Sequence, residues 1–273
     1  MATSASFPVT LSVAGSDCSS GAGLQADLKT FSAFRTYGLT VVTCVVSEVP
    51  GKVNRIALID PEMVADQLAL LLEGFPVAAL KTGMLHSQAV IRQVAALLCQ
   101  IPVARRPKLV VDPVMVATSG DPLIEPDAIG AYEELLFPIA EVITPNLDEA
   151  AVLLKRKLTR ETDLAPAAES LHSRYGCAVL LKGGHLRGKT AVDVLRDQRG
   201  FTWHRAPFVP GISTHGTGCT YSAAITAALA KGEPLRTAVR QAKKFVSAAI
   251  AQSFRWGSGR RRIDALNHLQ RMQ

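Results

Sequence analysis

Short apolar runs alternate with amphipathic segments along most of the chain. The apolar runs are continuous and rich in valine and leucine, which is typical of strands buried on both faces of a parallel sheet. They cover residues 9–15, 39–46, 77–83, 107–114, 140–146 and 177–184. The sequence therefore predicts a mostly parallel central sheet.

The segments between these runs have the spacing of helices. Leu24, Leu28, Phe31 and Phe34 follow one another at steps of four, three and three residues, which places them on one helix face. "PEMVADQLALLLEG" opens with proline and closes with glycine, as a well-defined helix does. Helices are predicted over residues 23–34, 61–74, 87–100, 125–138, 147–156, 163–175, 217–232 and 234–252.

Residues 190–197 and 201–209 have the alternating pattern of strands and are separated by "QRG", so we predict an antiparallel strand pair there. The order of strands and helices indicates an α/β fold with helices on both faces of the sheet. No linker or repeat interrupts it, and we predict one domain over residues 1–273. Ligands of such sheets bind beyond the carboxyl ends of the strands, so the loops that follow strands are the places to search.

The composition narrows the class of protein. No apolar run reaches the ~18 residues of a membrane span, and "MATSASFPVT" lacks the basic and apolar regions of a secretion signal. The five cysteines are dispersed and none forms a C-x-x-C pair, which disfavours a zinc or redox site and fits a reducing compartment. We therefore expect a cytoplasmic protein without a membrane partner.

The net charge of +7 arises partly from the arginine-rich stretch "FRWGSGRRRIDALNHLQR". Aromatic residues are not interleaved with the basic ones, so we interpret this stretch as a solvated tail helix and expect no nucleic-acid partner. The basic balance also suits a small anionic substrate.

Two glycine-rich motifs suggest nucleotide binding, but their context argues against both. "GGHLRGKT" matches the phosphate-loop pattern, yet the following residues have strand alternation, whereas that loop needs a helix beginning at its lysine, here Lys189. "GAGLQA" matches part of the dinucleotide-binding pattern, but "SDCSS" separates it from the strand. We interpret the first as a hairpin and the second as a helix entry or a substrate loop that brings Asp27.

Four strand-end loops carry complementary polar groups. They contribute Asp112, then Asn146, Asp148 and Glu149, then Lys182, and finally the backbone N–H groups of "THGTGCT". Each has a structural alternative, because a carboxylate can cap a helix and a lysine can end a strand. Together they offer carboxylates for Mg²⁺, a cation for phosphate and an anion hole, which are the requirements of phosphoryl transfer.

Several long motifs resemble the hydroxymethylpyrimidine/phosphomethylpyrimidine kinase family of the ribokinase-like superfamily. They are "VAGSD", "GAGLQADLKTFSAFRTYGLTVVT", "KTGML", "VVDPVM", "ITPNLDEA", "LLKGGHL" and "THGTGCTYSAA", in family order from about residue 10 to 255. The resemblance implies a three-layer αβα sandwich, ATP as cosubstrate, Mg²⁺ as cofactor, and a homodimer. A monovalent cation is a further candidate cofactor, whose role the sequence leaves open. It implies phosphorylation of 4-amino-5-hydroxymethyl-2-methylpyrimidine, and then of its monophosphate, in thiamine synthesis.

The resemblance also assigns roles to positions of this chain. It implies three groups: the pyrimidine site with Gly15, Asp27, Glu48, Met84 and Val114; the nucleotide and metal side with Asp112, Asn146, Glu149 and Lys182; and the anion hole and catalytic position with Gly216, Thr217, Gly218 and Cys219. For Cys219 we expect a general base, since a thiol at a helix N-terminus beside glycine N–H groups has a lowered pKa. The alternative is a small residue that fills a helix start.

The chain departs from the family at two places. "DCSSG" stands where Asp-Pro-Ser-Gly-Gly is usual, and Val49 and Pro50 stand where Asn-Thr follows the glutamate. Because these departures concern the substrate side, a kinase of B6 vitamers is the alternative substrate reading. A ligand-binding regulator without catalysis is an alternative of another class.

Overall fold

The structure is a computed structural model that describes residues 7–115, 123–125, 127–184, 186, 188–212, 215–259 and 262–270. Residues 116–121 of the "VVDPVMVATSGD" stretch, and residues 185, 187, 213 and 214 of the glycine-rich stretches, lie outside this part. The first half of the chain forms β1 (Val9–Asp17), α1 (Gly23–Ala33), β2 (Tyr37–Val49), β3 (Lys52–Leu58), α2 (Pro61–Gly74), β4 (Val77–Thr82), α3 (Gln88–Gln100), η1 (Val103–Arg105) and β5 (Lys108–Val111).

The second half begins with a helical segment of mixed geometry. It then continues the alternation of strands and helices: α4 (Ala128–Ala131), η2 (Tyr132–Leu136), η3 (Phe137–Ile139), β6 (Val142–Ile143), α5 (Leu147–Leu154), η4 (Glu161–Asp163), α6 (Leu164–Tyr175), β7 (Ala178–Lys182), β8 (Thr190–Asp197), β9 (Gly200–Pro207), α7 (Thr217–Ala230), α8 (Leu235–Ala251), β10 (Phe254–Trp256) and β11 (Ile263–Ala265).

The central sheet has the strand order β3-β2-β1-β4-β5-β6-β7-β8-β9. Strands β2, β1, β4, β5, β6 and β7 are parallel, whereas β3 and β8 run antiparallel to their neighbours. The chain passes from β1 to β2 on one side and later to β4 on the other side of β1. Such a reversal of strand order opens a crevice at the carboxyl ends of the strands, where ligands bind.

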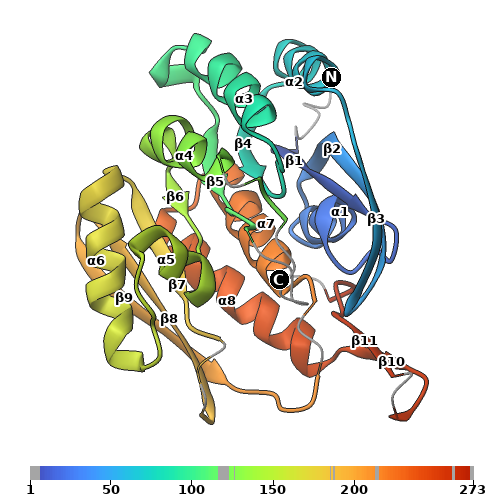
Figure 1. Ribbon diagram of the computed structural model, residues 1–273, viewed down its shortest axis with the longest axis vertical. Helices are drawn as coiled ribbons and strands as arrows, with labels where there is room; N and C mark the ends of the chain where they lie inside the picture. The colour runs from blue at the N-terminus through green and yellow to red at the C-terminus, as the bar shows by residue number, and fades with distance from the viewer. Residues whose placement is uncertain are drawn as a thin grey trace, which may run out of the picture.

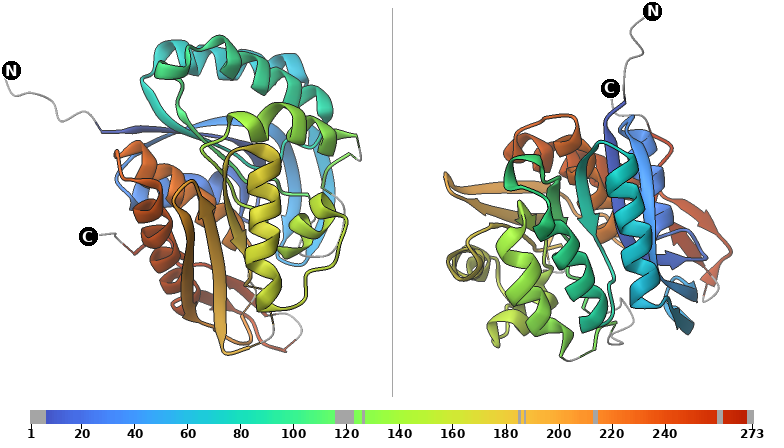
Figure 2. Two further views of the ribbon diagram at one scale, coloured as in Figure 1. Left: turned by 90° about the vertical axis from the view of Figure 1, so that its left-hand side faces the viewer. Right: turned by 90° about the horizontal axis from the view of Figure 1, so that it is seen from above.

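Helices cover both faces of the sheet, which confirms the predicted three-layer αβα sandwich (Figures 1 and 2). Helices α1, α7 and α8 pack on one face, where Val110, Val142 and Leu180 belong to their core. The neighbouring strand residues Val111 and Ile143 belong to the core on the opposite face, with α2, α3 and α6. Both faces are apolar because successive strand residues point to opposite sides.

The hairpin interpretation of "GGHLRGKT" is confirmed. Strand β8 begins at Thr190 and pairs with both β7 and β9, and the Lys189 carbonyl accepts the N–H of Phe208 at 2.9 Å, which continues the ladder. No helix N-terminus therefore lies behind the exposed Lys189. The tail-helix prediction is wrong: in the described part of that stretch, β10 and β11 form a separate antiparallel ribbon, with Arg255 and Arg262 both ion-paired to Asp264.

One strand of the central sheet was missed by the sequence pattern. Residues Lys52–Leu58 form β3, which pairs antiparallel with the end of β2, so that Pro50 and Gly51 form the turn of a hairpin. The side chains of β3 are mostly exposed, so the apolar signal of a buried strand is absent there. This hairpin forms one wall above the carboxyl edge of the sheet.

Candidate active site

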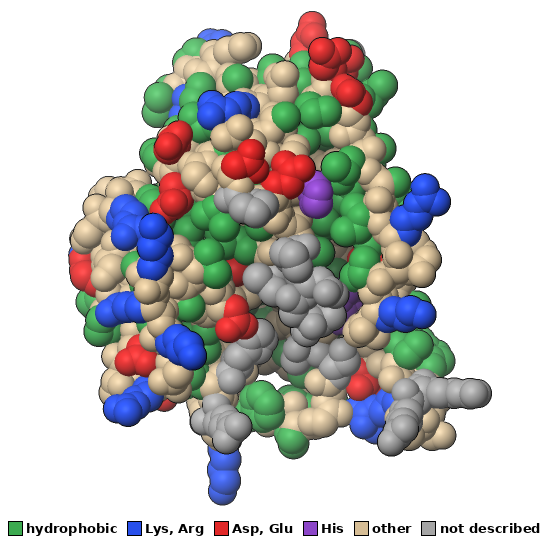
Figure 3. Space-filling model, in the orientation of Figure 1, with side chains coloured by type: hydrophobic (Ala, Val, Ile, Leu, Met, Phe, Trp, Pro, Cys, Tyr) green, Lys and Arg blue, Asp and Glu red, His purple; other side chains and the backbone are tan. Residues whose placement is uncertain are grey.

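A cavity of about 560 Å³ lies at the carboxyl edge of the sheet and is lined by strand ends and by the start of α7. Figure 3 shows acidic and histidine side chains near the middle of the face seen in Figure 1, with Lys and Arg side chains mainly toward its margins. Every predicted site residue except Asp27 lines this cavity: Gly15, Glu48, Met84, Asp112, Val114, Asn146, Glu149, Lys182, Gly216, Thr217, Gly218 and Cys219.

An ion pair between Lys182 and Asp112 lies at the centre of the cavity wall. The Lys182 Nζ is 2.9 Å from Asp112 Oδ1, and Asp112 also accepts hydrogen bonds from Thr144 and Ser222. Burial raises the pKa of Asp112, but the charges of Lys182 and Lys81 outweigh it and leave the pKa below its usual value. Burial conversely lowers the pKa of Lys182, and the negative charge of Asp112 more than offsets this. Both groups are therefore charged at neutral pH.

Glu149 closes a capping box at the start of α5. The Asn146 side chain accepts the N–H of Glu149 at 2.9 Å, and the Glu149 carboxylate accepts the N–H of Asn146 at 2.8 Å. The helix cap anticipated as the structural alternative is thus present, and the same carboxylate also faces the cavity. Burial raises the pKa of Glu149 to about 7; the charge of Lys182 opposes this and that of Asp112 adds to it.

The start of α7 approaches two other segments closely, and at Gly216 only glycine fits. Gly216 has a φ of +78°, and a Cβ there would lie 1.8 Å from the carbonyl oxygen of Gly21. A Cβ on Gly218 would lie 3.2 Å from the Nζ of Lys182. No side chain of the described residues caps this helix, and Gly216, Thr217 and Gly218 line the cavity together with Lys182, so the first N–H groups of the helix are available for an anion hole.

Cys219 lies on the first turn of α7 and lines the cavity, as predicted. Its predicted acidity is wrong for the unliganded protein. Burial raises the pKa of the Cys219 thiol to about 11; Lys81 opposes this rise, whereas Asp27 and Asp112 add to it. Desolvation of a thiolate in a wall with two carboxylates outweighs the favourable helix N-terminus.

One end of the cavity is formed by Gly15, Met84, Val114 and Glu48, and we call it the acceptor end. A Cβ on Gly15 would lie 2.6 Å from the Cys44 sulfur and 3.8 Å from that of Met84, so this wall is tightly packed. Val114 has a φ of +36°, which is strained for a β-branched residue and is typical of functional sites.

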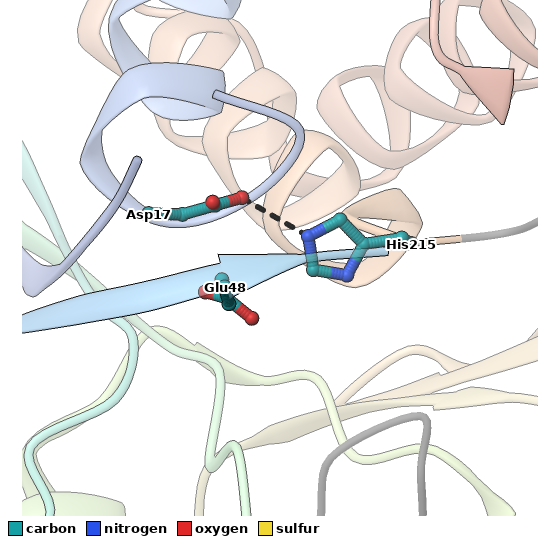
Figure 4. A group of neighbouring side chains, drawn as sticks. All are labelled: Asp17, Glu48 and His215. Carbon is teal, nitrogen blue, oxygen red and sulfur yellow. Dashed lines mark hydrogen bonds and ion pairs between the residues drawn. The ribbon is translucent and has the colours of Figure 1, made fainter. Parts of the chain in front are cut away.

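Asp17 and His215 join Glu48 at the acceptor end, and the sequence patterns gave neither of them a role (Figure 4). The ligand atoms of the three side chains lie within 4.8 Å of one another. Asp17 Oδ2, however, already accepts hydrogen bonds from Ser19 Oγ, the N–H groups of Gly21 and Ala22, and His215 Nε2, the last at 3.0 Å. We therefore interpret the group as a latch between the loop after β1 and the start of α7 rather than as a metal site.

The electrostatics of this latch follow from its burial and its charges. Burial raises the pKa of Asp17, but the hydrogen bonds from His215 and Ser19 outweigh it and lower the pKa well below its usual range. Burial lowers the pKa of His215, and Asp17 and Glu48 more than compensate, so the pKa is raised. Burial also raises the pKa of Glu48, with a further contribution from the charge of Asp17.

Asp27 does not reach the cavity, which corrects the prediction that it contacts substrate. It lies inside α1 with no exposed side-chain surface, and Lys81 Nζ donates to its carboxylate oxygens at 2.8 and 3.0 Å. Ser12 donates to the same carboxylate. The sequence contained a signal for this pair, because a lysine at position 81 in an otherwise apolar strand needs a buried partner.

The other end of the cavity, which we call the nucleotide end, is lined by residues that the sequence motifs did not indicate. They lie on β8, on α7 and α8, and on the segment after β9, and include Ala191, Asp193, Phe208, Val209, Tyr221, Lys243, Val246 and Ile250. Lys243 Nζ donates to Asp193 at 2.7 Å, and Asp193 also accepts the N–H of Gly183. This polar contact lies within an otherwise apolar wall, which suits a flat ring system with a polar edge.

Residues 17–264 match the family model for phosphomethylpyrimidine kinase. The chain belongs to the phosphomethylpyrimidine kinase family. It is 43% identical to the hydroxymethylpyrimidine/phosphomethylpyrimidine kinase of Rhizobium meliloti, with 93% of this chain and 94% of that protein covered. It is also 43% identical to the thiamine biosynthesis bifunctional protein ThiED of Geobacter sulfurreducens, of which it spans half.

Solved structures include an ADP complex of Bacillus subtilis pyridoxal kinase, with a TM-score of 0.86 and 36% identity over 97% of this chain and 99% of that one. This likeness agrees with the ribokinase-like sheet of this chain. None of the helices in the described ranges is long and apolar enough to cross a membrane. Members of the phosphomethylpyrimidine kinase family use ATP, and the question for this chain is which alcohol it phosphorylates.

Proposed function

We propose that the protein transfers the γ-phosphoryl group of ATP to the hydroxymethyl group of 4-amino-5-hydroxymethyl-2-methylpyrimidine, and then phosphorylates the monophosphate, in thiamine synthesis. The observation that carries this proposal is the single cavity with two unlike ends that meet at the Lys182–Asp112 pair and the glycine turn of α7. A phosphoryl group held at this junction faces a cation and uncapped N–H groups, which stabilise its transferring oxygens.

At the nucleotide end we propose that the adenine ring packs between Val209, Val246 and Ile250, with the Asp193–Lys243 pair at its polar edge. Lys182 neutralises charge on the phosphates. The N–H groups of Gly216, Thr217 and Gly218 bind the transferring phosphoryl oxygens through the backbone, so this function does not depend on their side chains.

The residues beside this junction fit a magnesium ion. Asp112 and Glu149 offer the carboxylate oxygens that Mg²⁺ prefers. The pKa of Glu149 is raised mainly by burial and further by the charge of Asp112, and a cation bound there would favour the ionised carboxylate. We propose that Glu149 and Asp112 hold Mg²⁺, directly or through water, with Asn146 fixing Glu149 through the capping box. Bound there, the ion would offset the negative charge of the ATP phosphates.

At the acceptor end we propose that Glu48 binds the aminopyrimidine edge and that Gly15, Met84 and Val114 enclose the ring. An aminopyrimidine presents a donating amine beside an accepting ring nitrogen. A carboxyl group with a raised pKa matches both, because one proton can be shared between Glu48 and the ring nitrogen. Asp27, sealed beneath, has no part in this contact.

Cys219 lines the cavity on the first turn of α7, and we propose that the acceptor hydroxyl approaches the phosphoryl group beside it. We propose that its thiolate form receives the hydroxyl proton as the new P–O bond forms and the bond from the γ-phosphorus to the bridging oxygen breaks, releasing ADP. The raised pKa makes the thiolate scarce at neutral pH, so this base should act more strongly as the pH rises. Homodimer formation, a cytoplasmic location and a monovalent-cation requirement stay predictions.

The test is ADP release, measured with the pyrimidine alcohol, its monophosphate, pyridoxine and pyridoxal as acceptors. We expect the highest kcat/KM for the pyrimidine alcohol and turnover of its monophosphate. The likeness to pyridoxal kinase, together with Val49 and Pro50 beside the acceptor end, supports a B6-vitamer kinase as the second candidate. A higher kcat/KM for pyridoxal would establish that candidate instead. If none of the four acceptors led to ADP release, both candidates would be contradicted.

A further inference from the structure

An exposed cysteine borders the acceptor end of the cavity. Cys18 follows directly after β1, and its sulfur lies 3.3 Å from the backbone nitrogen of Glu48 and 3.2 Å from the backbone oxygen of the same residue. The Glu48 N–H donates to the sulfur, and the thiol donates to the Glu48 carbonyl. A single side chain thus engages both main-chain polar groups of the residue assigned to the acceptor ring.

The Cys18 thiol bonds the main chain of Glu48 at a position where β1 has ended and supplies no backbone partner. Strands β1 and β2 pair through Ser16 with Val45 and Asp17 with Val46, and the Cys18 N–H still donates to the Val46 carbonyl at 3.4 Å. The chain then turns away, because the Ser20 N–H bonds back to the carbonyl of Asp17. At the next position of the ladder, the main chain of Glu48 is therefore hydrogen-bonded to the Cys18 sulfur instead of to a peptide group of β1.

The opposite edge of β2 gives Glu48 a less regular support. The register between β2 and β3 shifts between Ser47 and Glu48, so the regular ladder is interrupted at this residue. Contacts on the β1 side then matter more for the main-chain position of Glu48 than they would in the middle of a regular sheet.

We propose that Cys18 is a positioning residue, whose thiol holds the main chain at Glu48 so that the Glu48 carboxyl group faces the acceptor ring. This inference rests on the proposed function in one respect, namely that Glu48 binds the acceptor. Cys18 itself does not touch substrate. Its loss should therefore weaken acceptor binding while it leaves phosphoryl transfer from bound ATP nearly intact.

The experiment compares Cys18→Ala and Cys18→Ser with Cys99→Ala, a matched control at another exposed cysteine near the end of α3. The first measurement is hydrogen exchange of the Glu48 amide by NMR. We expect faster exchange in Cys18→Ala, partial restoration in Cys18→Ser, whose hydroxyl can still bond but is shorter, and no change in Cys99→Ala.

The second measurement is steady-state kinetics on the same variants. We expect Cys18→Ala to raise KM for the acceptor by ~3–10-fold, the range of one weak hydrogen bond, with kcat and KM for ATP changed less than twofold and with Cys18→Ser in between. A role in overall stability alone would not separate the two KM values in this way.

Unchanged exchange at Glu48, or faster exchange without a rise in acceptor KM, would overturn the proposal. Failure of the underlying assignment has a different signature. If Glu48→Gln leaves the acceptor KM unchanged, Glu48 does not bind the acceptor, whatever the exchange measurement shows.

Discussion

Two of the lysine–aspartate pairs among the described residues have nearly equal geometry and very different surroundings. The Nζ–oxygen distance is 2.8 Å between Lys81 and Asp27 and 2.9 Å between Lys182 and Asp112. The first pair is completely buried, whereas the Lys182 side chain is 12% exposed to the cavity. A fully buried ion pair can affect only the stability of the fold, whereas a pair of the same type in a cavity wall can also contact a ligand. Geometry alone therefore does not identify a catalytic lysine.

Removing the sealed lysine should have the largest effect on folding. In Lys81→Met the Asp27 carboxylate stays buried without its cation, and we expect the free energy of unfolding to fall by ~3–5 kcal/mol, as measured by urea denaturation. The double variant Lys81→Met/Asp27→Leu removes both charges and should regain most of this loss. Equal stability of Lys81→Met and the unmodified protein would remove the distinction between the two pairs.

Removing the cavity lysine should affect catalysis more than folding. In Lys182→Ala, Asp112 keeps its hydrogen bonds to Thr144 and Ser222, but the phosphates lose their cation. We expect kcat/KM for ATP to fall by ~10²-fold or more. The matched control is Lys189→Ala, which removes the exposed lysine of the phosphate-loop look-alike and should stay within a few-fold of the unmodified protein. The reverse order would restore the phosphate-loop interpretation.

Much of the fold was predictable because the spacing of apolar residues in each buried element is typical of a strand or of a helix. The apolar strands and the helix Pro61–Gly74 form where the sequence predicts them. Both faces of the sheet are covered by helices, and continuous apolar runs are buried best in such a sheet. Strand β3 was not predictable, because it is held by backbone pairing with β2 and its side chains face solvent. The tail failed for a related reason, since Asp264 organises its arginines into a ribbon and charge content alone does not specify a helix.

The site was predictable where a residue stands at the end of a strand, as Lys182 does, or directly after one, as Asp112 does. It was not predictable where two distant loops meet, as Asp17 and His215 do across almost the whole chain. Asp27 failed because position on a helix does not tell which side faces a cavity. The pKa of Cys219 failed because desolvation and neighbouring carboxylates depend on the packed structure.

Cys219 experiences charges from both pairs, since Lys81 lowers the pKa of its thiol and Asp112 raises it. If its sulfur accepts the substrate proton, kcat in Cys219→Ala should fall by ~10²-fold with little change in KM for ATP. In the unmodified protein kcat should rise with pH toward the thiol pKa of about 11, within the range where the protein stays folded.

Cys219→Asp supplies the control, because a carboxylate base is already ionised at neutral pH. This variant should recover part of the rate and flatten the pH profile. A near-normal kcat in Cys219→Ala would show that the turn acts through its backbone alone. Iodoacetamide should react slowly with Cys219 at neutral pH, and faster as the pH rises.

The ionisation of Glu149, beside the Lys182–Asp112 pair, should change the stability of the protein with pH, and this is the smallest of the expected effects. The pKa of Glu149 in the folded protein is about 7, against an ordinary value of 4.5. Between these values the folded state holds the proton more tightly than the unfolded chain, so the free energy of unfolding should fall as the pH rises from 4.5 to 7. The slope from one such group is at most ~1.4 kcal/mol per pH unit.

His215 has a raised pKa and contributes a slope of the same sign at higher pH, so the difference between variants isolates Glu149. Glu149→Gln keeps a side chain that can close the capping box but cannot ionise. We expect urea denaturation of Glu149→Gln to show a smaller loss of stability between pH 5 and pH 7.5 than the unmodified protein. Mg²⁺ should stabilise the unmodified protein at pH 7.5 and act less on Glu149→Gln. If the two proteins lose stability equally over this range, Glu149 ionises freely in the fold, and its burial beside Lys182 and Asp112 is not what prepares the site for a cation.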